Sequence, residues 1–408
     1  MKTKKYFYRY AILISCFILM AVPASLINSI HTLFITPVTQ SKGFSISGFS
    51  LIFTISAIVV AVASPVVGKI LNVIRLRNVM TGSAFLVGLG FMAYSLADTL
   101  PIFYVIAIVI ALGMTALTML PVSLMIKNWF AESQGTALGI VFAGVGTGTF
   151  FWMQIVSEVL NKYGFAYTYL LLGLIILAVA VPITFFFVYK SPAEKYHLEA
   201  TDEVSQSAIV TKSSFAEILK EPGFIAFAGG LFFLGFVVTG TQIHIQPYLM
   251  SLGYPLSYNA DIGSTIAMAG LIGSLLGGIV FDKLPIKLAL GSFTIAFLIA
   301  LFLLFFADRA GVPPIFAIVF GISLCVSSLW PPYGVGKIFK SLEYGSTLGL
   351  ANLFFVSGGA LGPFFSGMMA DSQFGYKAAW CIYFLCATIY LLLFFHCLNH
   401  DKSKHDRA

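Results

Sequence analysis

The sequence predicts an all-α membrane protein with about twelve transmembrane helices, arranged as two six-helix bundles related by pseudo-two-fold symmetry. Three observations predict this fold. The composition is too apolar for a water-facing surface. About twelve apolar stretches are long enough to cross a bilayer. The second half of the chain repeats the first at an offset of 210 residues.

The composition points to a lipid environment. Hydrophobic residues fill 59% of the 408 positions and charged residues 10%, and the mean hydropathy is +0.95. A soluble domain carries about 25% charged residues. We therefore expect the lipid bilayer to be the main partner. The net charge of +7 does not indicate nucleic-acid binding, because Lys and Arg in membrane proteins gather on the cytoplasmic side.

The motifs of several other protein classes are missing from the sequence. There is no Walker loop, which argues against an ATP-driven pump, and no HExxH or clustered metal ligands. The five cysteines lie in apolar runs without a CxxC pair. We expect no enzyme, no cofactor, no metal site and no disulfide framework. The N-terminal apolar run resembles a signal peptide, but it continues past Ser25, so we interpret it as the first spanning helix.

The apolar stretches fall into two sets of six. A spanning helix needs about 20 mostly apolar residues. The first set lies near 10–37, 46–69, 79–97, 101–126, 136–160 and 166–189, and the second near 223–249, 261–281, 286–307, 311–336, 346–370 and 377–397. Residues 190–222 hold six acids and four lysines. The sequence thus predicts an N-terminal bundle at 1–189, a cytoplasmic linker at 190–222 and a C-terminal bundle at 223–408.

The cations predict the orientation. With both termini in the cytoplasm, 19 of the 23 Lys and Arg residues lie inside. The four outside are Lys42, Lys162, Arg309 and Lys377. We expect a monomeric, multi-pass protein of the plasma (inner) membrane. The same assignment leaves no cation in the interior of a predicted helix.

The repeat is supported by matched prolines, glycines and a matched lysine at one fixed offset, a pattern that chance does not explain well. The matched pairs include Pro37 with Pro247, Gly43 with Gly253, Gly68 with Gly278, Pro121 with Pro331 and Lys127 with Lys337. An even number of helices per half gives both halves the same orientation in the membrane. Such halves enclose a midplane cavity that opens alternately to each side. We also expect the prolines of the Trp330–Tyr333 segment to break or kink their helix.

A loop motif carries a family resemblance. Gly68, followed by Asn72 and basic residues, resembles the loop after the second helix of major facilitator transporters, and the repeat at Gly278 and Asp282 matches better because it keeps the acid. The gating residues that the resemblance implies are Gly68, Asn72, Arg75, Arg77, Gly278, Asp282 and Lys283. We expect the Asp282 carboxylate to accept from helix N-terminal amides and nearby cations, and so to latch one state.

A second motif narrows the resemblance. Residues 127–130 (Lys-Asn-Trp-Phe) and 135–140 (Gly-Thr-Ala-Leu-Gly-Ile) are similar to the junction of the fourth and fifth helices in monocarboxylate and oxalate/formate transporters. Gln134 stands where an Arg is usual in that group. The resemblance implies the major facilitator fold and secondary transport of a small-molecule substrate.

Polar residues in the predicted spans are the candidates for substrate or proton binding. His31 lies near Asn28, and His244 lies between Gln242 and Gln246. Such groups are costly in a membrane and usually face a cavity or a polar partner. Each histidine therefore binds substrate or carries a proton, or else makes a hydrogen bond between helices or lies at the membrane interface. The further candidates are Gln154, Glu158, Trp330, Tyr333 and Asn352. Glu158 has the plainer alternative of a solvated acid at a helix end.

These features predict a secondary active transporter for a small organic solute, working by alternating access as an ion-coupled symporter or antiporter. The alternatives are a drug or metabolite efflux carrier and a non-transporting membrane receptor. A fifth helix without a Gly-Pro pair disfavours drug/proton antiport. Without a cation inside the bundle, a dianion such as oxalate lacks a partner in low dielectric. We therefore expect a neutral, zwitterionic or cationic solute, or a monoanion such as a monocarboxylate carried with a proton on histidine.

Overall fold

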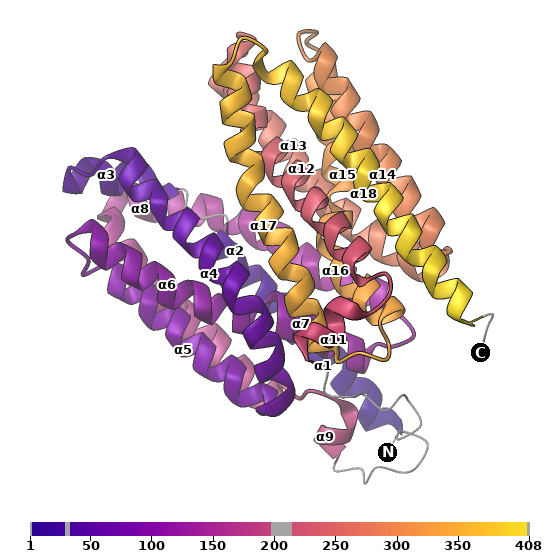
Figure 1. Ribbon diagram of the computed structural model, residues 1–408. Coiled ribbons are helices and arrows are strands. Elements are labelled where there is room, and N and C mark those ends of the chain that lie inside the picture. The colour runs from indigo at the N-terminus through magenta and orange to yellow at the C-terminus, as the bar shows by residue number, and fades with distance from the viewer. Residues whose placement is uncertain (1, 29–32, 197–213, 406–408) are drawn as a thin grey trace. The chain divides into compact units, whose positions relative to one another are not determined.

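The computed structural model describes residues 2–28, 33–196 and 214–405, and this part of the chain folds into helices and short turns without a strand (Figure 1). Eleven of the described helices are long and apolar enough to span a membrane. One of them, α8 (Gln134–Phe187), has 54 residues with a non-helical Gly164 at φ 78° and ψ 174°. A helix of that length measures about 80 Å, whereas a bilayer core is about 30 Å thick. It therefore crosses twice, which confirms the prediction of twelve crossings.

The chain forms two compact units. One comprises Met1–Glu132 with Val141–Ile209, and the other comprises Ser133–Ile140 with Val210–Ala408. The division between Ile209 and Val210 falls within the linker proposed at 190–222. The sequence did not indicate that the first two turns of α8 belong to the second unit.

The first unit begins with an interrupted helix and continues with a series of longer and shorter helices. It contains α1 (Lys2–Leu19), the π-helix η1 (Met20–Ala24), α2 (Ser25–Asn28), α3 (Ile35–Lys42), α4 (Ile46–Val73), α5 (Leu76–Tyr94), α6 (Leu100–Leu117), α7 (Met119–Trp129), most of α8 and α9 (Pro192–Tyr196). The Ser45 hydroxyl caps α4 by accepting from the Gly48 amide at 3.1 Å.

The second unit has the same plan. It contains α11 (Phe215–Lys220), α12 (Phe224–Ser251), α13 (Leu256–Lys283), α14 (Ile286–Leu303), the 3₁₀-helix η3 (Leu304–Phe306), α15 (Val312–Ser323), α16 (Cys325–Ile338), α17 (Tyr344–Asp371) and α18 (Gly375–His405). A capping box between Ser214 and Glu217 starts α11.

The backbone reproduces the repeat found in the sequence. Gly43 and Gly253 both take the left-handed conformation, at φ 68° and 88°. The following amides, of Phe44 and Tyr254, donate to the carbonyls of Thr39 and Leu249 at 3.1 and 3.2 Å. After these turns α4 and α13 each run for 28 residues, from positions 46 and 256. The two helix-loop-helix segments are therefore copies at the offset of 210.

The π-helix η1 explains a local change in this offset. A π-bulge adds one residue to a helix. Gly148 packs on the Ala21 carbonyl in the first unit, and Gly358 packs on the Phe232 carbonyl in the second. The glycines are 210 positions apart, but the carbonyls are 211 apart. The extra residue of the first unit is thus consistent with η1, which lies at Met20–Ala24.

The prolines do not all break their helices. We expected the prolines of the Trp330–Tyr333 segment to break or kink their helix; Pro331 and Pro332 lie inside α16, so the helix is not broken there. The join with α15 occurs earlier, at Leu324. In the first unit α6 and α7 meet at Thr118, whose φ of −108° and ψ of −110° are not helical, three residues before Pro121.

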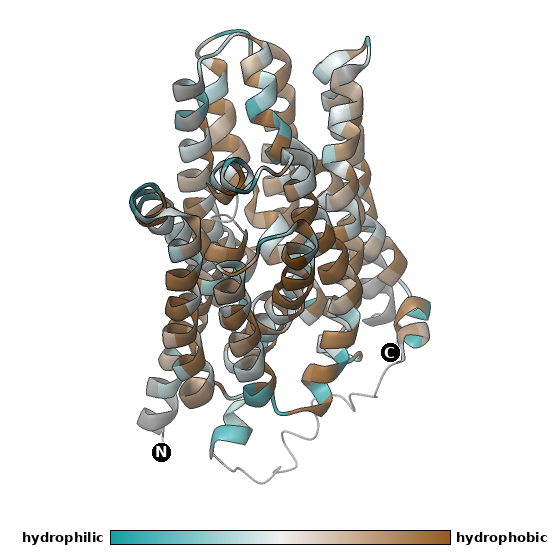
Figure 2. Cartoon of the chain, turned by 90° about the vertical axis from the view of Figure 1, so that its left-hand side faces the viewer, coloured by the Kyte–Doolittle hydropathy of each residue, from teal (hydrophilic) through white to brown (hydrophobic). Residues whose placement is uncertain are grey.

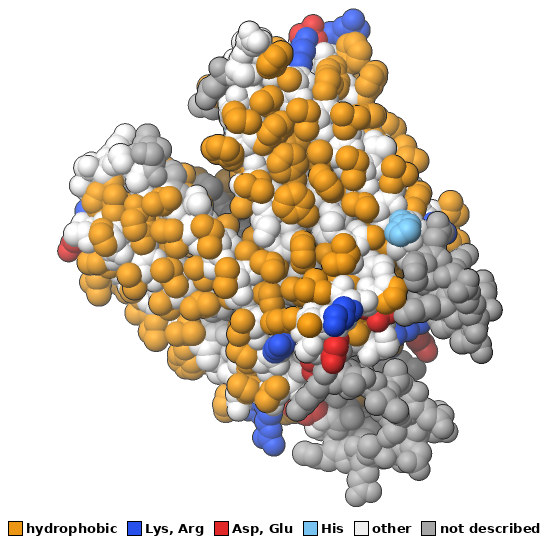
Figure 3. All heavy atoms as spheres, in the orientation of Figure 1, with side chains coloured by type: hydrophobic (Ala, Val, Ile, Leu, Met, Phe, Trp, Pro, Cys, Tyr) orange, Lys and Arg blue, Asp and Glu red, His pale blue; other side chains and the backbone are white. Residues whose placement is uncertain are grey.

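Each unit shows an apolar surface suited to lipid. Hydrophobic residues fill the middles of the helices, and hydrophilic ones gather toward their ends (Figure 2). Large apolar side chains point outward, as Leu385 and Leu392 of α18 do with 62% and 63% of their surface exposed. The visible face of the second unit is covered by such side chains, with charged groups near its ends (Figure 3).

Candidate functional site

Polar side chains line one face of α12 near the end that is remote from α11. Gln242 and Gln246 are exposed and lie one turn apart. The Gln246 amide nitrogen would be 3.1 Å from a Cβ built on Gly263, so this face turns toward α13. Before Gln242, the only exposed residue of α12 is Ile225. The helix is therefore enclosed by its own unit along most of its length and presents these two amides where the enclosure ends.

His244 lies on the other side of the same helix. Its Nδ1 atom is 3.4 Å from the Tyr376 hydroxyl of α18, and its ring would lie 3.7 Å from a Cβ on Gly367 of α17. The ring is half-buried. Residues two apart on a helix are rotated by about 200°. The sequence grouped His244 with Gln242 and Gln246, but the structure separates the imidazole from the two amides.

The remaining polar candidates are divided between the two units. Gln154 and Glu158 are exposed on α8 in the first unit, and Asn352 is buried in α17 of the second. His31 and the side chain of Asn28 lie outside the described residues. Among residues 2–28, 33–196 and 214–405 there is no group of three or more His, Cys, Asp or Glu side chains that could hold a metal ion.

Trp330 and Tyr333, which the sequence marks as candidate substrate contacts, lie in the core of the second unit. Trp330 is fully buried and its ring packs between those of Phe227, Phe281 and Phe394. The Tyr333 hydroxyl donates to the Phe281 carbonyl at 2.6 Å, which ties α16 to the end of α13. Both aromatic groups belong to the core of the second unit, because a bulky apolar ring is better buried than exposed to a wet cavity.

The Asp282 carboxylate holds the first turn of α8. It accepts hydrogen bonds from the amides of Gly135 and Thr136 at 2.8 and 2.6 Å. These amides have no partner inside the helix, and the helix dipole favours a negative charge beside them. Both partners lie in the second unit. This contact has the geometry of an anion bound at a helix N-terminus.

Glycines allow the close approach that this contact needs. A Cβ on Gly135 would lie 2.7 Å from the Gly278 carbonyl oxygen and 2.8 Å from the Asp282 carboxylate. A Cβ on Gly139 would collide with the Ser274 carbonyl. The backbones of α8 and α13 thus touch through small residues, as in other membrane helix pairs.

The motifs assigned to loops lie mostly in helices. Gly68 and Asn72 belong to α4, and Gly278, Asp282 and Lys283 to α13, while Arg77 is in the first turn of α5. Only Arg75 is in a connection. The connections between α4 and α5 and between α13 and α14 are each two residues long. The helices α4 and α13 therefore extend beyond the apolar stretches that predicted their ends. Asn72 donates to the Gly68 carbonyl in its own helix at 3.0 Å.

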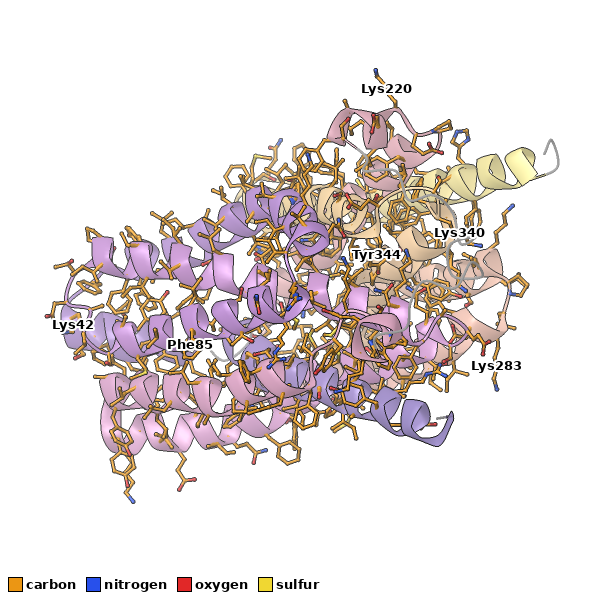
Figure 4. All side chains as sticks on the ribbon, turned by 90° about the horizontal axis from the view of Figure 1, so that it is seen from below. Lys42, Phe85, Lys220, Lys283, Lys340 and Tyr344 are labelled. Atoms are coloured by element: carbon orange, nitrogen blue, oxygen red, sulfur yellow. The ribbon has the colours of Figure 1, made fainter. Side chains whose placement is uncertain are left out.

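Basic groups surround the linker end of the second unit. Figure 4 shows Lys283 and Lys340 from this end, and both are exposed. Tyr344, at the start of α17, is buried, and its hydroxyl donates to the Pro332 carbonyl at 3.0 Å. The charged groups therefore face outward, and the helix start is tied inward by a neutral hydrogen bond.

An aromatic cluster at the linker end of the first unit escaped the sequence analysis. The Tyr8 ring contacts the rings of Trp129 and Tyr189, and its hydroxyl donates to the Phe187 carbonyl at 3.1 Å. The Lys195 ammonium lies 4.5 and 4.2 Å from the centroids of Tyr8 and Tyr189. We call Tyr8, Trp129, Tyr189 and Lys195 the linker clasp. In the sequence, the only indication of the linker clasp was that aromatic residues lie beside three predicted helix ends.

Hydrogen bonds extend the clasp to a neighbouring helix. Lys190 donates from its ammonium to the Leu71 carbonyl of α4 at 3.0 Å, and its amide donates to the Glu194 carboxylate at 2.6 Å. The Asn128 amide donates to the Lys190 carbonyl at 2.9 Å. The start of the proposed linker is thus part of the first unit.

Comparisons with known proteins agree with this architecture. The family model of the Major Facilitator Superfamily matches residues 17–335. The chain is 26% identical over 230 residues to "Oxalate:formate antiporter" of Oxalobacter formigenes, covering 54% of this chain and 51% of that protein. It is 22% identical over 377 residues to "Monocarboxylate transporter 13" of Rattus norvegicus, covering 87% and 82%. Across the first three curated relatives, the chain spans 50–58% of their length.

Solved structures show the same fold. The transporter FucP in the outward conformation superposes with a TM-score of 0.74 at 14% identity, covering 95% of this chain and 98% of that one. The proton:xylose symporter XylE superposes with a TM-score of 0.71 at 14% identity, covering 96% of both. At this identity the likeness concerns the fold alone.

Proposed function

Because the chain belongs to the major facilitator superfamily, we propose that it is a secondary active transporter that carries a small organic solute by alternating access. We propose the plasma membrane as its location, with the linker and both termini in the cytoplasm. The two-fold repeat of six-helix units supports alternating access, since rocking of two similarly oriented bundles is how such folds expose a central site to each side.

One observation carries the proposal for the solute. In every candidate span of the described chain, Lys and Arg lie within five residues of an end or next to the break at Gly164. A dehydrated dianion requires cationic or strongly donating partners. The solute is therefore a neutral or zwitterionic metabolite, or a monoanion of the monocarboxylate type that enters with a proton. The relatives named for monocarboxylates and for oxalate and formate support a small organic acid among these choices.

Purified protein in liposomes tests this proposal. We expect saturable uptake of lactate, formate or a zwitterionic amino acid, with a monocarboxylate taken up faster when the outside is acidic. Uptake into empty vesicles and release from loaded vesicles separate import from efflux. If the folded protein moves no member of the panel in either direction, yet shows a rise in melting temperature with one of them, the receptor alternative replaces transport.

A further inference from the structure

We propose that α12 carries two separate sites on opposite faces, a solute-binding face at Gln242 and Gln246 and a proton-binding site at His244 and Tyr376. This inference rests on the proposed transport function and specifies how a proton and a solute are coupled. Its premise is the rotation of about 200° between residues two apart on a helix. Gln242 and Gln246 share one face, and His244 points away from both.

Two exposed amides in an apolar helix support the solute face, because an unpartnered amide has an unfavourable free energy in lipid. Gln242 and Gln246 are exposed within the apolar helix Phe224–Ser251. An amide without a hydrogen-bond partner is unfavourable in an apolar medium. The pair therefore faces water rather than lipid, and an amide offers both donors and an acceptor. Such a face suits a hydroxyl, an amide or a protonated carboxylic acid, none of which needs a cation.

The surroundings of the His244 imidazole support the proton site. The absence of a side chain at Gly367 leaves room for the ring, Tyr376 supplies a polar partner at 3.4 Å, and the backbone of Pro363 supplies another. A neutral Nδ1 can accept from the tyrosine hydroxyl, whereas a protonated ring donates from both nitrogens. Proton binding thus reverses this contact and adds a charge where α12 meets α17 and α18.

The other titratable and charged groups of the packed elements are few. Tyr248 of α12 contacts the Tyr376 ring at 5.4 Å, and Lys377 follows Tyr376 and is exposed. Asp371 ends α17, with a side chain outside the described part, and Asp261 is exposed near the start of α13. The charged groups of α11, α13 and α16 at the linker end (Glu217, Lys220, Glu221, Asp282, Lys283 and Lys337) lie toward the other end of α12, about 30 Å from His244. Tyr383 of α18 lies beside Gly240, one turn before His244, and its hydroxyl donates to the Gly362 carbonyl at 2.7 Å.

A change at Tyr376 reaches further groups. Its ring stacks on Trp380 with an interplanar angle of 14°, and the Tyr248 hydroxyl donates to the Leu304 carbonyl at 2.9 Å. Among the described residues, neither Gln242 nor Gln246 forms a hydrogen bond with this aromatic group. Coupling between proton and solute therefore passes through a movement of α12 and not through a direct hydrogen bond.

Two measurements test the proposal. The first needs no substrate: in protein labelled with ¹³C-histidine, the His244 ring signal is followed from about pH 5.5 to about pH 8. We expect it to titrate and its midpoint to shift in Tyr376→Phe, while His396→Gln, which alters an exposed histidine elsewhere on α18, leaves it unchanged. A His244 signal that does not titrate, or that ignores Tyr376→Phe, overturns the proton site.

The second measurement is lactate uptake by liposomes at several pH values. Gln242→Leu and Gln246→Leu should each raise KM about tenfold without moving the pH profile. His244→Gln should flatten the profile and leave KM within about twofold. Gln40→Leu, an exposed glutamine of α3, is the matched control for the glutamines. A KM rise in His244→Gln as large as in the glutamine variants would overturn the separation of the sites. If the wild type moves no solute of the panel, the transport proposal and the solute face fall together, while the titration still decides the proton site.

Discussion

Asp282 accepts a hydrogen bond of 2.8 Å from the Gly135 amide at the first turn of α8, whereas its counterpart Asn72, 210 residues earlier, donates to a carbonyl of its own helix. The repeat therefore has one charged contact of this kind and one neutral position. A carboxylate at a helix N-terminus stabilises the folded protein by about 0.3–1 kcal/mol through the helix dipole alone. A hydrogen bond to a charged group stabilises it by about 1.5–3 kcal/mol more. The asymmetry makes unequal effects of mutation in the two copies testable.

We predict that Asp282→Asn cuts the transport rate by about tenfold or more and leaves the protein folded, because the neutral amide has a weaker attraction for the α8 amides. Asn72→Ala should change the rate less than twofold. Initial rates in liposomes and melting temperatures in detergent check both parts. Full activity in Asp282→Ala and in Asn72→Ala alike would end the latch hypothesis.

A second prediction concerns the glycine contacts inside each unit. Gly148 and Gly358 lie on the carbonyls of Ala21 and Phe232 so closely that an added methyl group has no room. Each Gly→Ala variant should lose about 1–3 kcal/mol of stability through overpacking. Gly82→Ala is the control, since nothing lies within 4 Å of its built Cβ, and it should gain up to about 1 kcal/mol from helix propensity. Equal melting temperatures for the three variants would contradict the packing argument.

The linker clasp supports a third prediction. Lys195→Met removes two cation–π contacts, worth about 0.5–1 kcal/mol each when partly exposed. The chain after Phe187 should then be cut faster by a glutamate-specific protease, which has sites at Glu199 and Glu203. Lys195→Arg keeps the interaction and should behave as wild type, and Lys220→Met, at an exposed lysine of α11, controls for loss of charge. Identical cleavage in Lys195→Met and wild type would show that the clasp does not hold the linker.

The fold could be predicted from the sequence because its determinants are local and repeated. The turn at Gly43 and Gly253 needs a left-handed residue, and the helices α4 and α13 have the same length. Helix ends were harder to predict, because α4 continues through Asn72, beyond the apolar stretch at 46–69. Hydropathy records where lipid stops and not where the backbone stops being helical.

The candidate site could be predicted only in part. The polarity of Gln242, His244 and Gln246 marks them as unusual for a span, but linear adjacency hides that they face opposite sides of the helix. The burial of Trp330 could not be predicted, because a sequence cannot show the rings of Phe227 and Phe281 around it. Burial depends on which helices pack together, and that information is not local.

The last prediction concerns the charge of the solute. The described spans hold no Lys or Arg away from their ends or the Gly164 break. Each unpaired carboxylate in an apolar medium carries a desolvation cost on the order of tens of kcal/mol by the Born estimate, far more than two amides return. We therefore expect no saturable oxalate exchange at about pH 7.5, where histidine is mostly neutral. Formate or lactate uptake, if present, should rise as the pH falls, because the monoanion then enters with a proton.

The measurement is exchange of labelled oxalate in liposomes, with labelled lactate as the positive control in the same preparation. Saturable high-affinity oxalate exchange that persists in the His31→Gln, His244→Gln double variant would show that the bundle binds a dianion without a cation, and the charge argument would be wrong.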